Sequence, residues 1–218
     1  MYLTVKAVIF DMDGVITDTM PYHYKAWKTI FGRYGISVSH LDIYSREGQK
    51  GIESVREIFE EHNHPFYGIQ AVSLLRAKEE LFKKIFKRRF IRGARLFVRR
   101  LVREGFKVAL VTGTSRHEAI RLLPENLFDL FSVTVCGCDV QNGKPHPEPY
   151  LTALRKLNLR KEEVVVIENA PFGIRSAKAS GLRCLGLSTS LPHRYLKGAD
   201  AVFPSFKDLG RSIVFVKG

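Results

Sequence analysis

Cysteine and long apolar runs are scarce in this sequence, and both absences narrow what the protein can be. The 218 residues include three cysteines, Cys136, Cys138 and Cys184, which are too few for a disulfide framework and are not spaced as a zinc site. No apolar run approaches the roughly 18 residues of a membrane-spanning helix, and the N-terminal stretch reaches an acidic cluster too early for a signal peptide. We therefore expect a cytoplasmic protein that does not enter the membrane.

Acidic residues are scarce relative to basic ones. The chain holds 35 Lys and Arg residues against 22 Asp and Glu residues, a formal net charge of +13, which attracts phosphate esters, nucleic acid or acidic lipid. Residues 83–103 alone contain ten Lys or Arg residues and no acid. We interpret this stretch as two helices on either side of Gly93 whose apolar sides pack inward while the basic side chains stay in water. A groove for nucleic acid is the alternative.

The composition and the pattern of apolar residues predict an α/β fold. Hydrophobic residues make up 45% of the chain and charged residues 26%, as in folded globular proteins. Short apolar runs rich in β-branched residues alternate with helix-length segments, which is typical of a parallel sheet covered on both faces. We predict a Rossmann-like, three-layer α/β/α core. Its strands are expected at residues 5–10, 107–112, 133–136, 164–167, 184–187 and 201–203.

A long insertion separates the first predicted strand from the second. About 95 residues lie between them, many more than a strand-helix-strand crossover needs. Apolar residues recur at helical spacing in three parts of this segment, residues 23–34, 52–61 and 70–86. We therefore predict an all-helical cap domain at residues 19–92, inserted into a core domain formed by residues 1–18 and 93–218. Two chain crossings between the domains allow a hinge.

Two aspartates follow the first predicted strand directly. Asp11 and Asp13 are separated by one residue and followed by Gly14, which lets the chain turn sharply. Ligands of open parallel sheets bind at the carboxyl ends of the strands, and paired carboxylates there suit a divalent cation and two distinct chemical roles. A solvated acidic loop is the alternative for this motif taken alone.

Later predicted strands end in, or lead into, groups that bind phosphate or a hard cation. A hydroxyl and a small-residue turn precede a helix, where free backbone N–H groups bind anions. A lone lysine stands between Gly and Pro, and a carboxylate with a side-chain amide ends another strand. These residues are, in chain order, Thr112, Gly113, Thr114, Lys144, Glu168 and Asn169. The sequence therefore predicts phosphate and metal chemistry at one edge of the sheet.

These motifs resemble those of the haloacid dehalogenase superfamily of phosphotransferases and phosphohydrolases, over essentially the whole chain. The four motifs of that family occur in order, as Asp11-x-Asp13, Thr112, Lys144 and Glu168-Asn169. The helical insertion resembles the small helical cap of the family. The residues Asp18-Thr19-x-x-Tyr22-His23 and Trp27 resemble the β-phosphoglucomutase-like branch, and Glu47-Gly48 resembles phosphatase members of that branch that include inorganic pyrophosphatases.

The resemblance implies a mechanism and a role for each site residue. Asp11 would attack phosphorus to form an aspartyl-phosphate, and Asp13 would protonate the leaving group and then activate water. The phosphoryl group would be held by Thr112, Gly113, Thr114 and Lys144. A Mg²⁺ ion would be held by Asp11, Asp13, Glu168 and Asn169 and would offset the repulsion between nucleophile and substrate. Closure of the cap would exclude water and select the leaving group.

Three cap residues are candidates for substrate contacts. Glu47 would reach a metal ion carried by a compact polyanion if it faces the site, and a solvated position at a helix start is the alternative. His23 lies one turn into the first cap helix, where a packing or hinge role is an equal alternative. Lys78 matches a cap lysine of the branch, although a solvated helix position is the simpler interpretation.

Two positions depart from the family pattern. Asn169 stands where a second acid is usual, which removes one negative charge and keeps an oxygen donor. Mutases of the branch carry an Arg shortly after the cap glycine to bind the far phosphate, whereas the nearest cation after Gly48 is Lys50. This difference counts against a mutase.

The sequence therefore predicts a Mg²⁺-dependent phosphohydrolase that acts on a small phosphorylated substrate. Pyrophosphate is the leading single candidate, ahead of sugar phosphates. A β-phosphoglucomutase-type isomerase is the alternative, and a non-catalytic binder of nucleic acid or other anions comes last. We expect a monomer or a weak homo-oligomer without membrane or nucleic-acid partners.

Overall fold

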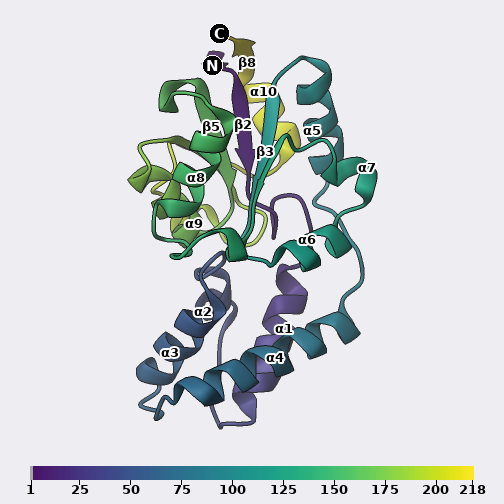
Figure 1. Ribbon diagram of the computed structural model, residues 1–218. Helices are drawn as coiled ribbons and strands as arrows, with labels where there is room; N and C mark the ends of the chain where they lie inside the picture. The colour runs from purple at the N-terminus through teal and green to yellow at the C-terminus, as the bar shows by residue number, and fades with distance from the viewer. Residues whose placement is uncertain (1) are drawn as a thin grey trace.

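A six-stranded parallel sheet forms the centre of the core domain in the computed structural model, which describes residues 2–218 (Figure 1). Its strands are β2 (Ala7–Phe10), β3 (Lys107–Val111), β4 (Val133–Val135), β5 (Val164–Glu168), β6 (Arg183–Leu187) and β7 (Ala201–Phe203). They lie in the order β4-β3-β2-β5-β6-β7. Because Phe10 is in register with Leu110 of β3 and Ile167 of β5, the carboxyl ends of these three strands meet at one edge.

Helices cover both faces of this sheet, so the predicted three-layer core is confirmed. On one face α5 (Ala94–Arg103) and α10 (Phe206–Ser212) pack on it, and on the other face α8 (Glu148–Leu157) and α9 (Pro171–Ala179). Every residue of β2 and β5 is buried, as their continuous apolar sequences predict for central strands. The shorter helices of the core are α6 (Arg116–Leu122), α7 (Glu125–Phe128), η1 (Gly137–Asp139), η2 (Lys161–Glu163) and η3 (His193–Tyr195).

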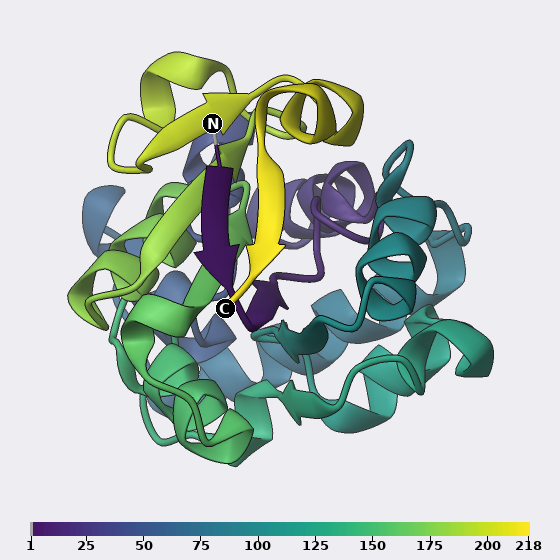
Figure 2. The ribbon, with the colours of Figure 1, turned by 90° about the horizontal axis from the view of Figure 1, so that it is seen from above.

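A second, two-stranded parallel sheet was not expected. It pairs β1 (Tyr2–Val5) with β8 (Val214–Lys217), and Figure 2 shows the two strands side by side next to both chain ends. The single strand predicted at residues 5–10 is therefore wrong at its start. The chain bends at Lys6, whose N–H donates to the carbonyl of Glu163 at 2.7 Å, so that β1 and β2 belong to different sheets.

Four helices form the segment between β2 and β3, and they lie together below the core in Figure 1. They are α1 (Met20–Gly32), α2 (His40–Tyr44), α3 (Gly51–Glu61) and α4 (Gly68–Ile85). Three of them match the predicted helices, and the short α2 was not predicted. They bury an apolar cluster that includes Ile30, Phe31 and Phe59, and Leu191 of the core joins this cluster.

The two chain crossings between cap and core lie side by side. The N–H of Asp18 donates to the carbonyl of Arg89 at 3.0 Å, and that of Ile91 donates to the carbonyl of Ile16 at 3.0 Å. Thr17 and Phe90 form an antiparallel bridge between these bonds. Cap and core are therefore joined through one short two-stranded connection, at which rotation of the cap would occur.

The basic stretch at residues 83–103 consists of two helical parts with an extended link between them, and the solvated interpretation holds. The helix α4 ends at Ile85, and α5 begins after Gly93, which has a φ of +87°. Phe97 and Leu101 are buried in the core, while Arg95, Arg99 and most other basic side chains of the stretch are exposed. In the part of the chain that the structure describes, we find no helix with the length and apolar character of a membrane span.

We predict that Phe10→Ala lowers the free energy of unfolding by about 3–5 kcal/mol. Phe10 is fully buried directly before Asp11. The centroid of its ring lies 6.3 to 6.5 Å from the ring centroids of Phe97, Phe131 and Phe206. Urea unfolding followed by circular dichroism measures the change. The control is Leu96→Ala, on an exposed position of α5, which should change stability by less than about 0.5 kcal/mol. Equal effects of the two variants would contradict this view of the core.

Candidate active site

The ammonium group of Lys144 joins two carboxylates at the edge of the sheet. Asp11 follows β2 and Glu168 ends β5, so the parallel register places their side chains next to each other. The Nζ of Lys144 donates to Asp11 Oδ1 at 2.6 Å, to Glu168 Oε1 at 2.7 Å and to the carbonyl of Val111 at 3.3 Å. All three charged side chains are about 1% exposed, so this ion-pair group is shielded from water.

Glu168 accepts hydrogen bonds on both of its oxygens. Besides Lys144, Oε1 accepts from the hydroxyl of Tyr150 at 2.7 Å. Oε2 accepts from the N–H groups of Asn169, at 2.8 Å, and Ala170, at 3.3 Å. The carboxylate of Glu168, which the sequence suggested as a metal ligand, therefore holds Lys144 in this structure. Tyr150 was missed, because nothing in the sequence marks a buried tyrosine in α8 as a partner of the site.

Two buried oxygens at the site accept no hydrogen bond from the described residues, namely Asp11 Oδ2 and Asn169 Oδ1. The amide nitrogen of Asn169 donates to Ser190 Oγ at 2.8 Å, which leaves its oxygen free to act as an acceptor. Residues 2–218 contain no group of three or more His, Cys, Asp and Glu side chains arranged to hold a metal ion. A carboxylate and an amide oxygen without partners nevertheless fit a divalent cation that also takes backbone and water oxygens.

The buried charges at the site change each other's protonation. Burial raises the pKa of Asp11 to about 8, because the nearby Lys144 offsets only part of this effect and the carboxylates of Glu168 and Asp13 add to it. Burial would lower the pKa of Lys144, but Asp11 and Glu168 raise it above its ordinary value. Lys144 therefore stays positively charged, and a cation at Asp11 would favour the ionised form of that carboxyl.

Asp13 has hydrogen-bond donors on both of its oxygens. Thr19 donates to Oδ1 at 2.5 Å, and His23 Nε2 lies 3.4 Å from the same oxygen. Thr112 and Thr114 donate to Oδ2 at 3.3 and 3.0 Å. Burial alone would raise the pKa of Asp13, but the hydrogen bonds, above all the one with His23, lower it to about 2. Asp13 is therefore held as a carboxylate.

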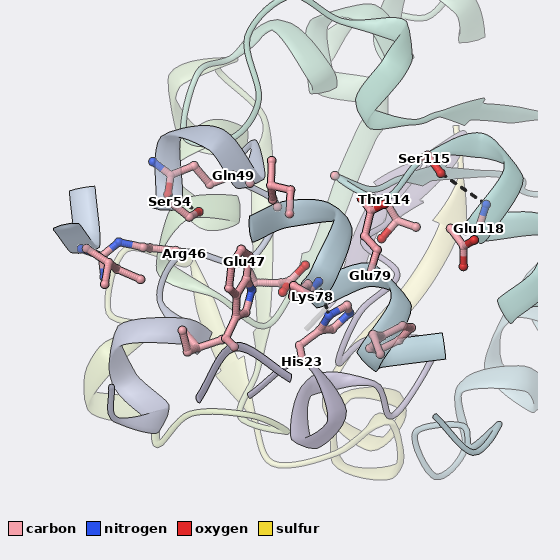
Figure 3. Close-up of a pocket in the computed structure, with 18 of the residues that line it drawn as sticks. His23, Arg46, Glu47, Gln49, Ser54, Lys78, Glu79, Thr114, Ser115 and Glu118 are labelled. Atoms are coloured by element: carbon pink, nitrogen blue, oxygen red, sulfur yellow. Dashed lines mark hydrogen bonds between the residues drawn. The ribbon is translucent and has the colours of Figure 1, made fainter. Parts of the chain in front are cut away.

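A chain of side chains from the cap reaches Asp13. Lys78 Nζ lies 3.0 Å from His23 Nδ1, and the two side chains point toward each other (Figure 3). An ammonium group only donates, so Nδ1 accepts and the proton of a neutral His23 stands on Nε2, facing Asp13. Burial and the charge of Lys78 lower the pKa of His23 and keep it neutral. The ring of Phe82 stacks on that of His23 with centroids 4.3 Å apart.

The structure places two of the cap residues next to the site, and His23 also has the packing contact with Phe82. His23 contacts the site directly through Asp13. Lys78 is only half-buried on α4, yet its ammonium group turns inward to His23 and lies 5.3 Å from the centre of the Trp27 ring. The solvated interpretation of Lys78 is therefore wrong.

A pocket of about 210 Å³ lies between cap and core beside these groups. The cap contributes His23, Glu47 and Lys78 to its lining, and the core contributes Gly113 and Thr114. Burial, followed by the charges of Asp13 and Asp11, raises the pKa of Glu47 well above its ordinary value. Glu47 therefore lies half-buried in the lining of this pocket, and a fully solvated position does not describe it.

The predicted site residues come together, and three further residues complete the site. Asp11, Lys144 and Glu168 form one bonded group, and Asp13, Thr112 and Thr114 form a second. The residues that the sequence analysis gave no role are Thr19, Tyr150 and Ser190. Thr19 belongs to the Asp18-Thr19 motif quoted above, so a signal existed for it, whereas the contact of Ser190 depends on the fold alone.

Comparison with known proteins agrees with this geometry. The family described as "Haloacid dehalogenase-like hydrolase" matches residues 8–187. A phosphorylated carbohydrates phosphatase of Thermotoga maritima is 35% identical over 86% of this chain and 87% of its own length. A β-phosphoglucomutase of Bacillus subtilis is 31% identical over 94% of this chain and 92% of its own length.

Solved structures show the same relationship. The crystal structure of a β-phosphoglucomutase from Clostridium difficile superposes with a TM-score of 0.81 at 27% identity, over 95% of this chain and 97% of that chain. The chain therefore belongs to the haloacid dehalogenase-like hydrolase family and, within it, to the β-phosphoglucomutase-like branch.

Proposed function

We propose that this haloacid dehalogenase-type phosphatase hydrolyses small phosphate monoesters through an aspartyl-phosphate on Asp11. One observation carries the proposal. Asp11 is buried at the end of the central strand with one oxygen bonded to Lys144 at 2.6 Å and the other oxygen without a partner. The bonded oxygen fixes the orientation of the carboxyl, so that the second oxygen is available to a phosphorus atom or to a cation that accompanies it.

Lys144 and the turn after β3 would stabilise the transferred phosphoryl group. Lys144 is positive and lies beside the nucleophile, where it offsets negative charge that shifts during the displacement. The hydroxyls of Thr112 and Thr114 both lie within 3.3 Å of Asp13 Oδ2, which places both ends of the turn beside Asp13. Gly113, between them, lines the pocket and leaves its N–H close to the space for the phosphoryl oxygens.

Asp13 would move protons between substrate and water. Its hydrogen bonds hold it as a carboxylate, the form that accepts a proton from the water attacking the aspartyl-phosphate. In the first displacement the proton that a bound phosphate monoanion loses would pass through Asp13 to the leaving oxygen, so that Asp13 ends this step as a carboxylate again. The chain from Lys78 through His23 fixes the direction in which Asp13 presents its oxygens and draws the cap toward the core.

Mg²⁺ is the cation that we propose for this site. It would be held by Asp11 Oδ2, Asn169 Oδ1 and the backbone carbonyl of Asp13, with the anionic Glu168 nearby. When bound, it supplies positive charge that reduces the repulsion between the nucleophile and the phosphate and favours the ionised form of Asp11.

The lining of the pocket favours a neutral, hydroxyl-rich leaving group. Two of its cations are already paired with carboxylates, since Arg46 contacts Glu57 and Lys83 contacts Glu80 and Glu118, and the third, Lys78, contacts the neutral ring of His23. Hydroxyls and carboxylates that line the same pocket, such as Ser115 and Glu118, accept hydrogen bonds from a polyol. We therefore propose a sugar or polyol monophosphate as the substrate, which agrees with the phosphorylated carbohydrates phosphatase among the relatives.

Pyrophosphate is the second candidate, and Glu47 favours it. This carboxyl faces Asp11 and Asp13 closely enough for both to raise its pKa. A compact polyanion that brings its own divalent cation would give the Glu47 carboxylate a partner.

A mutase activity is not supported by the cap loop. A mutase needs a cation that binds the second phosphate of a bisphosphate intermediate while that intermediate reorients in the site. Lys50 is the first cation after Gly48, and its Nζ donates to the carbonyl of Val140 at 3.1 Å, so it is engaged outside the pocket.

A phosphate-release screen with Mg²⁺ tests the proposal. The panel contains hexose and polyol monophosphates, a hexose bisphosphate and pyrophosphate, and we expect the monophosphates to show the highest kcat/KM. Asp11→Asn should lower kcat by about 10³-fold or more with the fold intact, because the amide is no nucleophile. The matched control is Asp129→Asn, on an exposed residue, which should keep full activity. Retained turnover by Asp11→Asn would exclude Asp11 as the nucleophile.

We predict that His23→Phe moves the acidic limb of the kcat pH profile to higher pH. The hydrogen bond from His23 lowers the pKa of Asp13, so its removal raises that pKa. On acidification Asp13 then takes up its proton at a higher pH and stops acting as a base. Phenylalanine keeps the stack on Phe82. Initial rates from pH 3.5 to 8 measure the shift, and His193→Phe on an exposed residue is the control. An unchanged limb would mean that Asp13 is not the titrating base.

We predict that Asn169→Asp increases the affinity for Mg²⁺ by about tenfold, because it adds one negative charge where the free oxygen lies. Isothermal titration of the substrate-free protein with MgCl₂ measures it directly. Ser190 is able to donate to the new carboxylate, so the side chain keeps its support. An affinity equal to that of the unmodified protein would show that residue 169 does not contact the cation.

A further inference from the structure

The loop between α2 and α3, residues 45–50, lies directly on the core next to Lys144. The backbone N–H of Lys144 donates to the carbonyl of Gly48 at 3.2 Å, and that of Phe172 donates to the carbonyl of Ser45 at 3.3 Å. The Lys50 side chain adds a third bond, to the carbonyl of Val140. Through these bonds one cap loop contacts two separate segments of the core, the loop that contains Val140 and Lys144 and the start of α9.

Glycines allow this loop to approach so closely. Gly48 has a φ of +81°, and a Cβ atom there would lie 2.4 Å from Cδ of Lys144. A Cβ atom on Gly113 would lie 2.9 Å from the carbonyl oxygen of Gly48, and one on Gly143 would lie 3.0 Å from the nitrogen of Lys50. The loop therefore covers the aliphatic part of Lys144 and helps to keep its ion pairs out of water.

Glu57 of α3 stabilises the conformation of this loop through two hydrogen bonds. Its Oε2 accepts from Arg46 Nε at 3.1 Å, and its Oε1 accepts from Gln49 Nε2 at 2.7 Å. These two partners flank Glu47 and Gly48 on either side. Gln49 is held further by Ser54, whose hydroxyl donates to its Oε1 at 2.8 Å, and Figure 3 shows Arg46, Gln49 and Ser54 around this part of the pocket.

We propose that Glu57 is the positioning residue of the cap loop. Its carboxylate joins Arg46 to Gln49 and so sets the turn that places the Gly48 carbonyl on the Lys144 amide and directs Glu47 into the pocket. Glu57 contacts neither the substrate space nor the catalytic carboxylates. By holding the loop on the core, Glu57 keeps Lys144 buried. The surroundings of the Lys144 ammonium group, which lies beside Asp11, therefore depend on closure of the cap. The expected effect on kcat rests on the proposed function, whereas the expected effect on the exchange rate of the Lys144 amide does not.

The surroundings of Glu57 distinguish it from an ordinary surface ion pair. Its partner Arg46 is only 11% exposed, donates to the carbonyl of Asp42 at 2.9 Å and also pairs with Glu61, whereas Gln49 has no other carboxylate partner among the described residues. On the same helix Glu60 pairs with Arg56 at 4.0 Å, and both of these side chains are more than half exposed. Exposed pairs of that kind contribute little. Glu60 is therefore a matched control with the same helix, residue type and change of charge.

The test compares Glu57→Gln with Glu60→Gln. Glutamine has one acceptor oxygen, so in the first variant either Arg46 or Gln49 faces an amide NH₂ group in place of a carboxylate oxygen. In the substrate-free protein we expect hydrogen–deuterium exchange of a peptide containing the Lys144 amide to be at least about fivefold faster in Glu57→Gln, and unchanged in Glu60→Gln. With substrate we expect kcat to fall by about tenfold with a smaller change in KM, because Lys144 acts in the transition state.

Equal exchange at Lys144 in the two variants would overturn the proposal, whatever their activity. If the exchange differs as expected and the unmodified protein releases no phosphate from any substrate, the proposed function fails and the role of Glu57 stands. Should Glu57→Gln not fold, Gln49→Ala removes one side of the same support. This second variant must then show faster exchange at Lys144 than Glu60→Gln, and an unchanged rate would again overturn the proposal.

Discussion

The buried ammonium group of Lys144 is the interaction on which the site depends. Two carboxylates and a lysine are enclosed at the sheet edge, and charges in such surroundings are tolerated only when they are paired and hydrogen-bonded. Lys144 meets this condition by contacting Asp11, Glu168 and a backbone carbonyl at once. If Lys144 were removed, two buried carboxylates would face each other without compensation. Glu168 and Tyr150 thus serve to hold the lysine, and the lysine in turn orients the nucleophile.

The two aspartates of the first motif differ because their surroundings differ. Asp11 is buried beside other carboxylates, which raises its pKa to about 8, whereas hydrogen bonds from His23, Thr19 and Thr114 lower the pKa of Asp13 to about 2. Environments that separate the pKa values of neighbouring acids are how one site assigns them different tasks. In the proposed mechanism the free oxygen of Asp11 is left for the phosphorus atom or its cation, while Asp13 is held as a carboxylate that accepts a proton. One strand end thus supplies both functions because the chain turns sharply at Gly14.

Much of the core and most of the residues that come together at the candidate site were predictable from the sequence. The central strands are continuous apolar runs and the motif residues stand directly at their ends, so local pattern and chain position were sufficient. The pairing of β1 with β8 was not predictable, since it joins the two ends of the chain and splits an apparently continuous strand at Lys6. Tyr150 and Ser190 were missed for the same reason, because their contacts with Glu168 and Asn169 exist only after folding.

The cap residues show where sequence reasoning reaches its limit. Lys78 has the pattern of a solvated helix residue, and only the packing of α4 against α1 reveals that it contacts His23. Glu47 and Lys144 are also brought together by the docked loop and not by any local motif. The pocket is therefore lined through tertiary contacts between cap and core, so the sequence motifs predict the class of reaction but not the leaving group.

The most direct test of the account is to look for the covalent intermediate. The protein is mixed with Mg²⁺ and the best phosphate monoester of the screen, quenched in acid within milliseconds, digested and examined by mass spectrometry. The account predicts a transient phosphoryl group on the peptide that contains Asp11, located on that side chain by fragmentation. A phosphoryl group on another residue, or turnover in which no labelled peptide forms at any quench time, would contradict it.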